Sequence, residues 1–266
     1  MNTVPPRSWR RPPRIRSPWL RRVLIVGGLL YIALAIASIG LDLPRLREGL
    51  PRGARFLAAL FHPDFATRWS DIRDGMLESL AMALVATAAG VVLSIPVALG
   101  AARNLSPAPL YLLSRAAIAL ARSLQEVIVA IFFVVIVGFG PMAGVLTLAF
   151  ASVGFLGKLL AEAIEAIDRR PVEAIRATGA GPAQILLFGV VPQILPRLVG
   201  LSAYRLDINF RESAVIGVVG AGGIGATLLT AFGRYEFGTA AAILLLIVAV
   251  VLAGEIAAGR LRRSFV

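Results

Sequence analysis

Charged side chains inside apolar segments are the residues of this chain whose type and position could do chemistry. Arg122, Glu126 and Arg197 each lie in a run that is otherwise hydrophobic. A charge there costs roughly 2.5 to 3.5 kcal/mol on insertion scales, so each needs an explanation. Arg122 and Glu126 are four residues apart, so either they pair on one helix face or Glu126 lines a transport path. Arg197 cannot easily reach a membrane surface, and we expect it to face the protein interior.

Two further arginines, Arg205 and Arg211, lie towards the outer end of the segment that holds Arg197. One interpretation is that both extend to lipid headgroups, and the other is that they attract an anion. Pro192 and Pro196 fall inside the same segment and remove backbone hydrogen bonds, which predicts a kink there.

A glycine-rich stretch, residues 220–225, matches the dinucleotide-binding pattern G-x-G-x-x-G. That pattern requires a βαβ unit and an acid about 20 residues later, whereas this stretch lies among apolar runs and the nearest following acid is Glu236. We therefore predict no nucleotide site. Two interpretations remain open, close packing of helices and a flexible gate beside a transport path. The candidate gate residues are Ser213, Gly220, Gly222 and Gly223.

Most catalytic chemistry is excluded by composition. The chain has no cysteine, and its one histidine is His62. Its one lysine, Lys158, is followed by Leu159, so no P-loop of the form G-x-x-x-x-G-K-[ST] is present. A membrane-embedded enzyme would need several His, Asp, Glu or Ser groups at one depth, and the apolar runs offer almost none. We predict no catalytic residue and no metal site, and any ATP hydrolysis must come from another subunit.

Membrane-spanning helices are the elements that must position these residues. Of the 266 residues, 58% are hydrophobic and 16% are charged, against roughly 25% charged in soluble domains. Six apolar runs are long enough to cross about 30 Å of hydrocarbon. The sequence therefore predicts an all-α polytopic membrane protein with about six transmembrane helices. The runs cover residues 23–41, 76–102, 110–137, 142–160, 183–203 and 237–257.

Arginine placement predicts the orientation of the chain. The net charge of +12 comes largely from arginines in the tails and between the runs, which fits membrane orientation better than nucleic-acid binding. Both arginine-rich termini are expected in the cytoplasm of a bacterium, with the chain in its inner membrane. An even number of crossings follows, so residues 213–233 are expected to enter and leave from the outer side. We divide the chain into an Arg/Pro-rich cytoplasmic tail (1–22), a first transmembrane helix with an extracytoplasmic loop (23–75) and a transmembrane core (76–266).

A short polar helix is predicted from Pro171 to Thr178, on the cytoplasmic side. Proline suits a first helical turn, Glu173 complements the positive end of the helix, and Gly179 can end it in a left-handed conformation. The helix would be about 12 Å long, too short to be stable alone in water. It is either an ordinary connector or a helix offered to the groove of a partner.

This region resembles the E-A-A, three residues, Gly, nine residues, I-x-L-P signature of permease subunits in binding-protein-dependent ABC importers. Glu173, Ala174, Gly179 and Pro192 fall at matching positions. The chain departs from the signature at three packing positions, which are Ile175, Gly189 and Val191. The glycine-rich segment 213–225 resembles the phosphonate-type branch of the methionine-permease-like superfamily, and a similar segment occurs in methionine and glycine betaine permeases. The resemblance covers about residues 76–263.

The resemblance implies a type I ABC importer permease that acts as a homodimer, with a cytoplasmic coupling helix near residues 168–180. Two ATPase subunits, which would hold ATP and Mg, receive that helix, and an extracytoplasmic binding protein delivers the substrate. No cofactor is expected in this chain. The implied ATPase-coupling residues are Glu173, Ala174, Ala177, Gly179 and Pro192.

The substrate suggested by charge is a small oxyanion such as phosphonate or phosphate. The alternatives are methionine or glycine betaine carried by the same architecture, and a passive channel or secondary transporter. The candidate residues of the translocation path or gate are Glu126, Arg197, Arg205, Arg211, Ser213, Gly220, Gly222 and Gly223.

Overall fold

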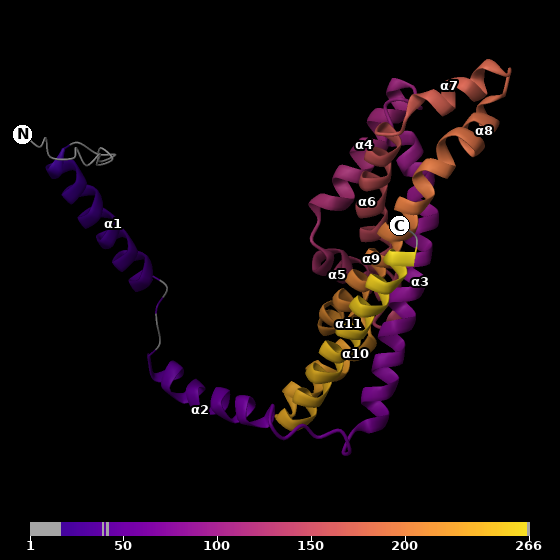
Figure 1. Cartoon of the computed structure of the whole chain (residues 1–266). Helices are drawn as coiled ribbons and strands as arrows, with labels where there is room; N and C mark the ends of the chain where they lie inside the picture. Colours follow the sequence, from indigo (N-terminus) through magenta and orange to yellow (C-terminus); the bar gives the residue numbers. More distant parts are fainter. Residues whose placement is uncertain (1–16, 39, 41–42, 265–266) are drawn as a thin grey trace, which may run out of the picture. The chain divides into compact units, whose positions relative to one another are not determined.

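The computed structural model describes residues 17–38, 40 and 43–264, and within those ranges it contains helices and no strand (Figure 1). The chain divides into two compact units, Met1–Ala54 and Arg55–Val266. The elements are α1 (Pro18–Ser38), α2 (Leu43–Ala59), α3 (Trp69–Ala101), α4 (Ala108–Ser123), α5 (Glu126–Val137), α6 (Pro141–Glu165), α7 (Arg169–Ala177), α8 (Pro182–Gln184), the π-helix η1 (Ile185–Val190), α9 (Val191–Ile216), the π-helix η2 (Gly217–Ala221), α10 (Gly223–Gly233) and α11 (Phe237–Ser264).

The predicted spans correspond to helices, with two corrections. The runs 23–41, 76–102, 142–160 and 237–257 lie largely within α1, α3, α6 and α11. The run 110–137 is two helices, α4 and α5, which meet at a bend of 95°. The run 183–203 covers only part of its helix, because helical structure continues over 40 residues from Pro182 to Ala221. Within the described residues, five helices are long and apolar enough to cross a membrane, or six if α4 and α5 count as one span, which agrees with the expected number.

Helix α2 was not predicted. It lies in the segment 42–75, which the sequence indicated only as an outer loop. Leucines at positions 43, 46, 50 and 57 recur at helical spacing among arginines, a pattern typical of an amphipathic surface helix. A search for long apolar runs does not find such a helix, because its polar face lowers the mean hydropathy.

The second unit is built around α3 and α6, whose close contact depends on small residues. A Cβ atom added at Gly90 of α3 would lie 2.3 Å from Cβ of Ser152 in α6, so only glycine allows this approach. Gly154 of α6 meets Ala121 of α4 in the same way, at 2.8 Å. Small residues that bring helix backbones together are a main source of helix association in membranes.

Three apolar clusters follow one another along this bundle. One includes Ile164 and Val190, the last residue of η1, a middle one includes Leu148 and Ile216, and a third includes Ile72 and Ile243. Figure 1 shows α7 and α8 projecting from one end of the bundle, while α10 lies towards the other end. Helix α10 has 11 residues, about 16 Å, and is too short to cross the hydrocarbon by itself.

Candidate functional site

Helix α7 is the predicted short polar helix, and it begins two residues earlier than expected. The Asp168 side chain caps it by accepting a hydrogen bond from the Arg170 backbone N–H at 3.0 Å. Pro171 lies in the first turn, where its missing N–H costs no hydrogen bond. After the helix, Gly179 has a φ of +83°, the left-handed conformation predicted for it.

One face of α7 packs on the protein and the other is open. Val172 and Ile175 are half-buried, whereas Glu173, Ala174 and Ala177 are exposed. Ala177 is four residues from Glu173 and three from Ala174, so the three side chains lie on one face. The predicted coupling residues of the helix itself therefore lie where a partner could reach them.

Helices α7 and η1 pack closely at Gly189. A Cβ atom at Gly189 would already lie 3.4 Å from Cδ1 of Ile175 and from Cα of Val172. The sequence marks Gly189 as a departure from the family signature, and in the structure this position has room for a methyl group against α7 but not for a larger side chain. Pro192 is exposed and is the second residue after η1, so the predicted distortion at this proline takes the form of a six-residue π-helix.

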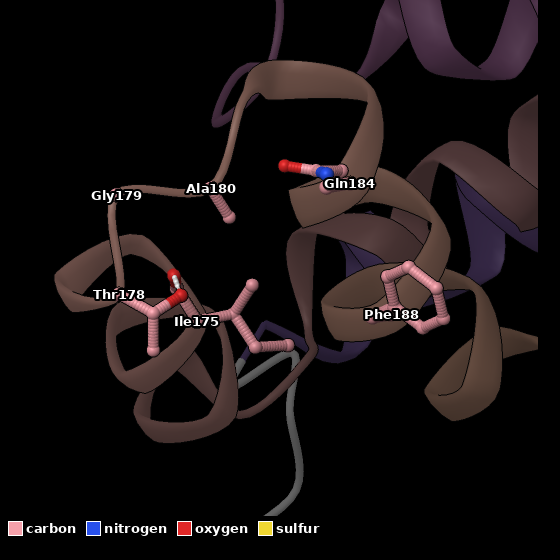
Figure 2. Close-up of a pocket in the computed structure, with 6 residues that line it drawn as sticks. All are labelled: Ile175, Thr178, Gly179, Ala180, Gln184 and Phe188. Atoms are coloured by element: carbon pink, nitrogen blue, oxygen red, sulfur yellow. Dashed lines mark hydrogen bonds between the residues drawn. The ribbon is translucent and has the colours of Figure 1, made fainter.

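A shallow pocket of about 420 Å³ lies beside this packing (Figure 2). The Gln184 side chain accepts a hydrogen bond from the Gly181 backbone N–H at 2.9 Å and so shapes the turn between α7 and α8. In Figure 2, Ile175 and Phe188 come from the two helices on either side of the pocket. Its lining residues are Ile175, Thr178, Gly179, Ala180, Gln184 and Phe188.

Glu165 organises a second polar site, at the end of α6 that leads into α7. Its Oε1 atom accepts hydrogen bonds from the backbone N–H of Arg103, at 2.8 Å, and from Nη2 of Arg115, at 2.9 Å. Asn104 donates from Nδ2 to the Ile164 carbonyl at 2.9 Å. The loop between α3 and α4 is thereby joined to the end of α6, three residues before the cap of α7.

A buried polar cluster lies between α3, α5, α6 and α9. Its centre is Arg205, which is 3% exposed. The guanidinium donates from Nε to Oγ of Ser152 at 2.9 Å and from Nη2 to Oε1 of Glu126 at 3.1 Å. Glu212 lies further away, with Oε2 at 3.9 Å from Nη2. The Phe155 ring faces the guanidinium carbon at 5.5 Å from the ring centroid.

This cluster corrects two expectations. Glu126 pairs with Arg205 on α9, not with Arg122 four residues before it, because the chain bends by 95° between α4 and α5 and Glu126 begins the second helix. Arg205 does not extend to headgroups, since it is buried and neutralised inside the protein.

Asn209 completes the cluster one turn along α9. Its Nδ2 atom donates to Oγ1 of Thr87 at 2.8 Å and to Oγ of Ser152 at 3.0 Å. Asn209, Ser152 and Thr87 are all buried, and sequence reasoning missed them, together with Glu212. The available signal was polar residues spaced along one apolar helix, Arg205, Asn209 and Glu212, which are four and three apart and therefore share a face.

The other two arginines of α9 are exposed. Arg197 was expected to face the protein interior. This was wrong for the single chain, because its side chain is exposed on the surface of α9. Arg211 is also exposed and forms an ion pair with Asp207, one turn before it. The structure therefore brings together Glu126 and Arg205, and it does not bring Arg197 or Arg211 to them.

The glycines of residues 217–225 are used for close packing. Gly220, Gly222 and Gly223 all have positive φ, at +97°, +80° and +70°. A Cβ atom at Gly222 would lie 2.6 Å from Oε1 of Glu78, and one at Gly223 would lie 2.4 Å from Oγ of Ser79. Of the two interpretations left open by the sequence, these contacts support packing.

Hydrogen bonds join the same segment to its neighbours. The Gly140 backbone N–H donates to the Gly220 carbonyl at 3.0 Å, and the Ile224 N–H donates to Oγ of Ser79 at 2.9 Å. Ser213, a further candidate gate residue, is buried and donates to the Phe210 carbonyl within α9.

Known proteins are similar to this chain in sequence and in fold. A family model described as "Binding-protein-dependent transport system inner membrane component" matches residues 90–265. The chain is 43% identical to the phosphite transport system permease protein PtxC of Stutzerimonas stutzeri, over 92% of this chain and 89% of that one. It is also 43% identical to the phosphate-import permease protein PhnE of Mycolicibacterium smegmatis, over 77% of this chain and 38% of that one. A chain of the inward-facing MetNI methionine ABC transporter in its native crystal form superposes with a TM-score of 0.63 at 30% identity, covering 73% of this chain and 96% of that chain.

Proposed function

Because the chain belongs to the family of binding-protein-dependent transport system inner membrane components, we propose that it is an ABC importer permease that carries a phosphorus oxyanion. The two relatives named for phosphite and phosphate transport are each 43% identical to it, against 30% for the methionine transporter structure. This difference favours an oxyanion over methionine, and nothing in the described residues favours glycine betaine. Family membership also argues against a passive channel and a secondary transporter.

The observation that carries the coupling role is the open face of α7. Glu173, Ala174 and Ala177 are exposed on a helix whose other face packs on η1. We propose that this open face enters a groove of an ATPase subunit, which holds the ATP and Mg. Gly179 ends the helix, and Pro192 follows the π-helix to which α7 is packed. This chain itself would then need no cofactor.

The proposed assembly contains a second copy of this permease, two ATPase subunits and an extracytoplasmic binding protein. Both termini would lie in the cytoplasm. The path between the two permeases would be lined by the exposed arginines of α9, Arg197 and Arg211. Glu126 and Arg205 would lie behind them, and Ser213 with Gly220, Gly222 and Gly223 would border the outer side.

The decisive experiment is reconstitution of the importer in lipid with Glu173→Arg. Asp74→Arg is the matched control, because Asp74 is an exposed acid at the opposite end of α3 from α7, with its side chain 63% exposed. Two quantities are measured: the amount of ATPase that co-purifies with the permease, and ATP hydrolysis stimulated by phosphite, phosphate, phosphonates, methionine and betaine with the binding protein.

We expect Glu173→Arg to lose the ATPase subunit and the stimulation, and Asp74→Arg to retain the ATPase subunit. Stimulation should occur with a phosphorus oxyanion and not with methionine or betaine. Normal assembly and hydrolysis of Glu173→Arg would refute the docking role of α7. Stimulation by methionine alone would refute the proposed substrate class.

A further inference from the structure

Arg205 has hydrogen-bonding capacity that the protein does not use. A guanidinium carries five N–H donors, and the hydrogen bonds to Ser152 and Glu126 use Nε and one N–H of Nη2. Among the described residues no hydrogen bond reaches Nη1. The edge formed by Nη1 and Nη2 is the edge that binds two oxygens of a phosphorus oxyanion side by side.

The carboxylates beside Arg205 also have hydrogen-bonding capacity that the protein does not use. Oε2 of Glu212 is buried and has no hydrogen-bond partner within the described residues, and at 3.9 Å from Nη2 it is too far for a hydrogen bond. One arginine against Glu126 and Glu212 gives the cluster a formal charge of −1 when all three are ionised. A buried carboxylate oxygen without a partner is stabilised most by a ligand that donates a hydrogen bond to it.

We propose that Arg205, Glu126 and Glu212 form a binding site for a protonated phosphorus oxyanion within the permease, an inference that rests on the proposed transport function. The P–O⁻ oxygens would accept hydrogen bonds from Nη1 and Nη2 of Arg205, and a P–OH group would donate to Oε2 of Glu212. Phosphate, phosphite and phosphonates carry such a P–OH group in their singly charged forms. Sulfate at neutral pH has no proton to donate and would meet a net negative cluster, so the site would reject it.

Access to the site is through the carboxylates. The side chains of Glu126 and Glu212 are 23% and 31% exposed, whereas that of Arg205 is 4% exposed. An anion that reaches the guanidinium must therefore come in between the two glutamates and replace part of the contact with Glu126.

The remaining polar residues position the guanidinium. Oγ of Ser152 accepts hydrogen bonds from Nε of Arg205 and from Nδ2 of Asn209. The same hydroxyl donates to the Leu148 carbonyl at 2.6 Å. Asn209 is joined in turn to Thr87 on α3. This chain of hydrogen bonds fixes which edge of Arg205 faces the glutamates.

The test uses the assembled permease and ATPase complex without its binding protein, so that selectivity of the binding protein does not contribute. Binding of radiolabelled inorganic phosphate is measured with and without excess sulfate. The variants are Glu212→Gln and Arg205→Lys. Asp207→Asn is the matched control, because Asp207 is an acid of the same helix whose ion pair, with Arg211, lies outside the cluster. Size-exclusion chromatography reports whether each complex is assembled.

We expect phosphate to bind the wild-type complex and sulfate not to compete. Glu212→Gln should weaken phosphate binding about tenfold, the effect of losing one charge-assisted hydrogen bond, and should allow sulfate to compete. Arg205→Lys should lose phosphate binding while the complex stays assembled, and Asp207→Asn should behave as wild type.

Three results would overturn the proposal: no phosphate binding by the assembled wild-type complex, equal competition by sulfate in the wild type, or an unchanged Glu212→Gln. Uptake by the complete importer with its binding protein separates this failure from failure of the proposed function. Uptake of a phosphorus oxyanion without binding in the complex rejects the site alone, and absence of uptake rejects the substrate class.

Discussion

Gln193 and Asp168 exchange hydrogen bonds in both directions between α9 and the start of α7. The Asp168 backbone N–H donates to Oε1 of Gln193 at 3.0 Å, and Nε2 of Gln193 donates to the Asp168 carbonyl at 3.2 Å. The same Nε2 donates to the Gly189 carbonyl of η1 at 2.7 Å. One amide side chain therefore joins the capping residue of α7 to the helix that carries Arg205, so a displacement of α7 is passed to α9.

Replacing Gln193 should separate ATP hydrolysis from transport. Gln193→Leu keeps a similar volume and removes three hydrogen bonds, each contributing about 0.5 to 1.5 kcal/mol. We expect the ATPase subunit to remain bound, because the exposed face of α7 is unchanged, and oxyanion uptake per ATP hydrolysed to fall several-fold. Gln184→Leu, which removes one local hydrogen bond, is the control. Equal uptake per ATP in Gln193→Leu and wild type would show that this side chain does not transmit the movement.

Position 189 should tolerate alanine and not a larger residue. A Cβ atom there would lie at 3.4 Å from its neighbours on α7, which is ordinary van der Waals contact. Gly189→Ala should therefore assemble and transport normally. Gly189→Leu should force α7 away from η1, with a cost of about 1 to 3 kcal/mol for overpacking, and should reduce the amount of ATPase that co-purifies. Full ATPase binding by Gly189→Leu would mean that the packing of α7 on η1 does not matter for docking.

Two glycine-to-alanine substitutions at the two ends of α10 should have opposite outcomes. Gly222→Ala places a side chain at a φ of +80° and against Glu78 and the Pro141 backbone nitrogen. The left-handed conformation alone costs about 1 to 2 kcal/mol, so the complex should denature at a lower temperature. Gly233→Ala meets open space and a φ outside the left-handed region, so its thermal stability in detergent should be unchanged or slightly higher. Similar melting of the two variants would contradict the packing interpretation of the glycine segment.

Asn209 should contribute moderately to stability. Asn209→Leu removes the amide N–H groups that donate to the hydroxyls of Thr87 and Ser152. Both hydroxyls still donate to backbone carbonyls, those of Ala83 and Leu148. We therefore expect a loss of about 1 to 2 kcal/mol, since no buried hydroxyl is left unpaired. Ser202→Ala, which removes one hydroxyl hydrogen bond within the same helix, is the control and should change stability less. Thermal denaturation of the two variants in detergent makes the comparison, and a larger effect of Ser202→Ala would contradict the role given to Asn209.

The spans and the short helix α7 were predictable because each depends on local sequence. Apolar runs set the positions of α1, α3, α6 and α11, and Pro171 with Gly179 set the limits of α7 to within two residues. The fold class follows from these elements alone. The continuation of α9 to Ile216 was missed because Arg205, Asp207, Arg211 and Glu212 lower the hydropathy of its second half, although Arg205, Asp207 and Arg211 form ion pairs within the structure.

The polar cluster could not be derived in the same way, because its partners are far apart in the chain. Glu126 and Arg205 are 79 positions apart, whereas the spacing rule applied to Glu126 considers partners three or four residues away. The bend between α4 and α5 turns Glu126 from Arg122 towards α9, and Leu124-Gln125 carries no proline or glycine that would predict it. The inward orientation expected for Arg197 was wrong for the single chain, because the depth of a residue along a helix says nothing about which face of the helix it occupies.

The π-helix η1 contributes to the direction of α7. A π turn holds about one residue more than an α turn, and each residue of an α-helix turns the chain by about 100°. Removing a single residue between Ile185 and Val190 would therefore turn α8 and α7 by up to about that angle around the axis of α9, while Arg205 and Asn209 keep their places. A change of one codon here re-aims the cytoplasmic helix, which gives this fold a simple way to adapt to an ATPase surface of different shape.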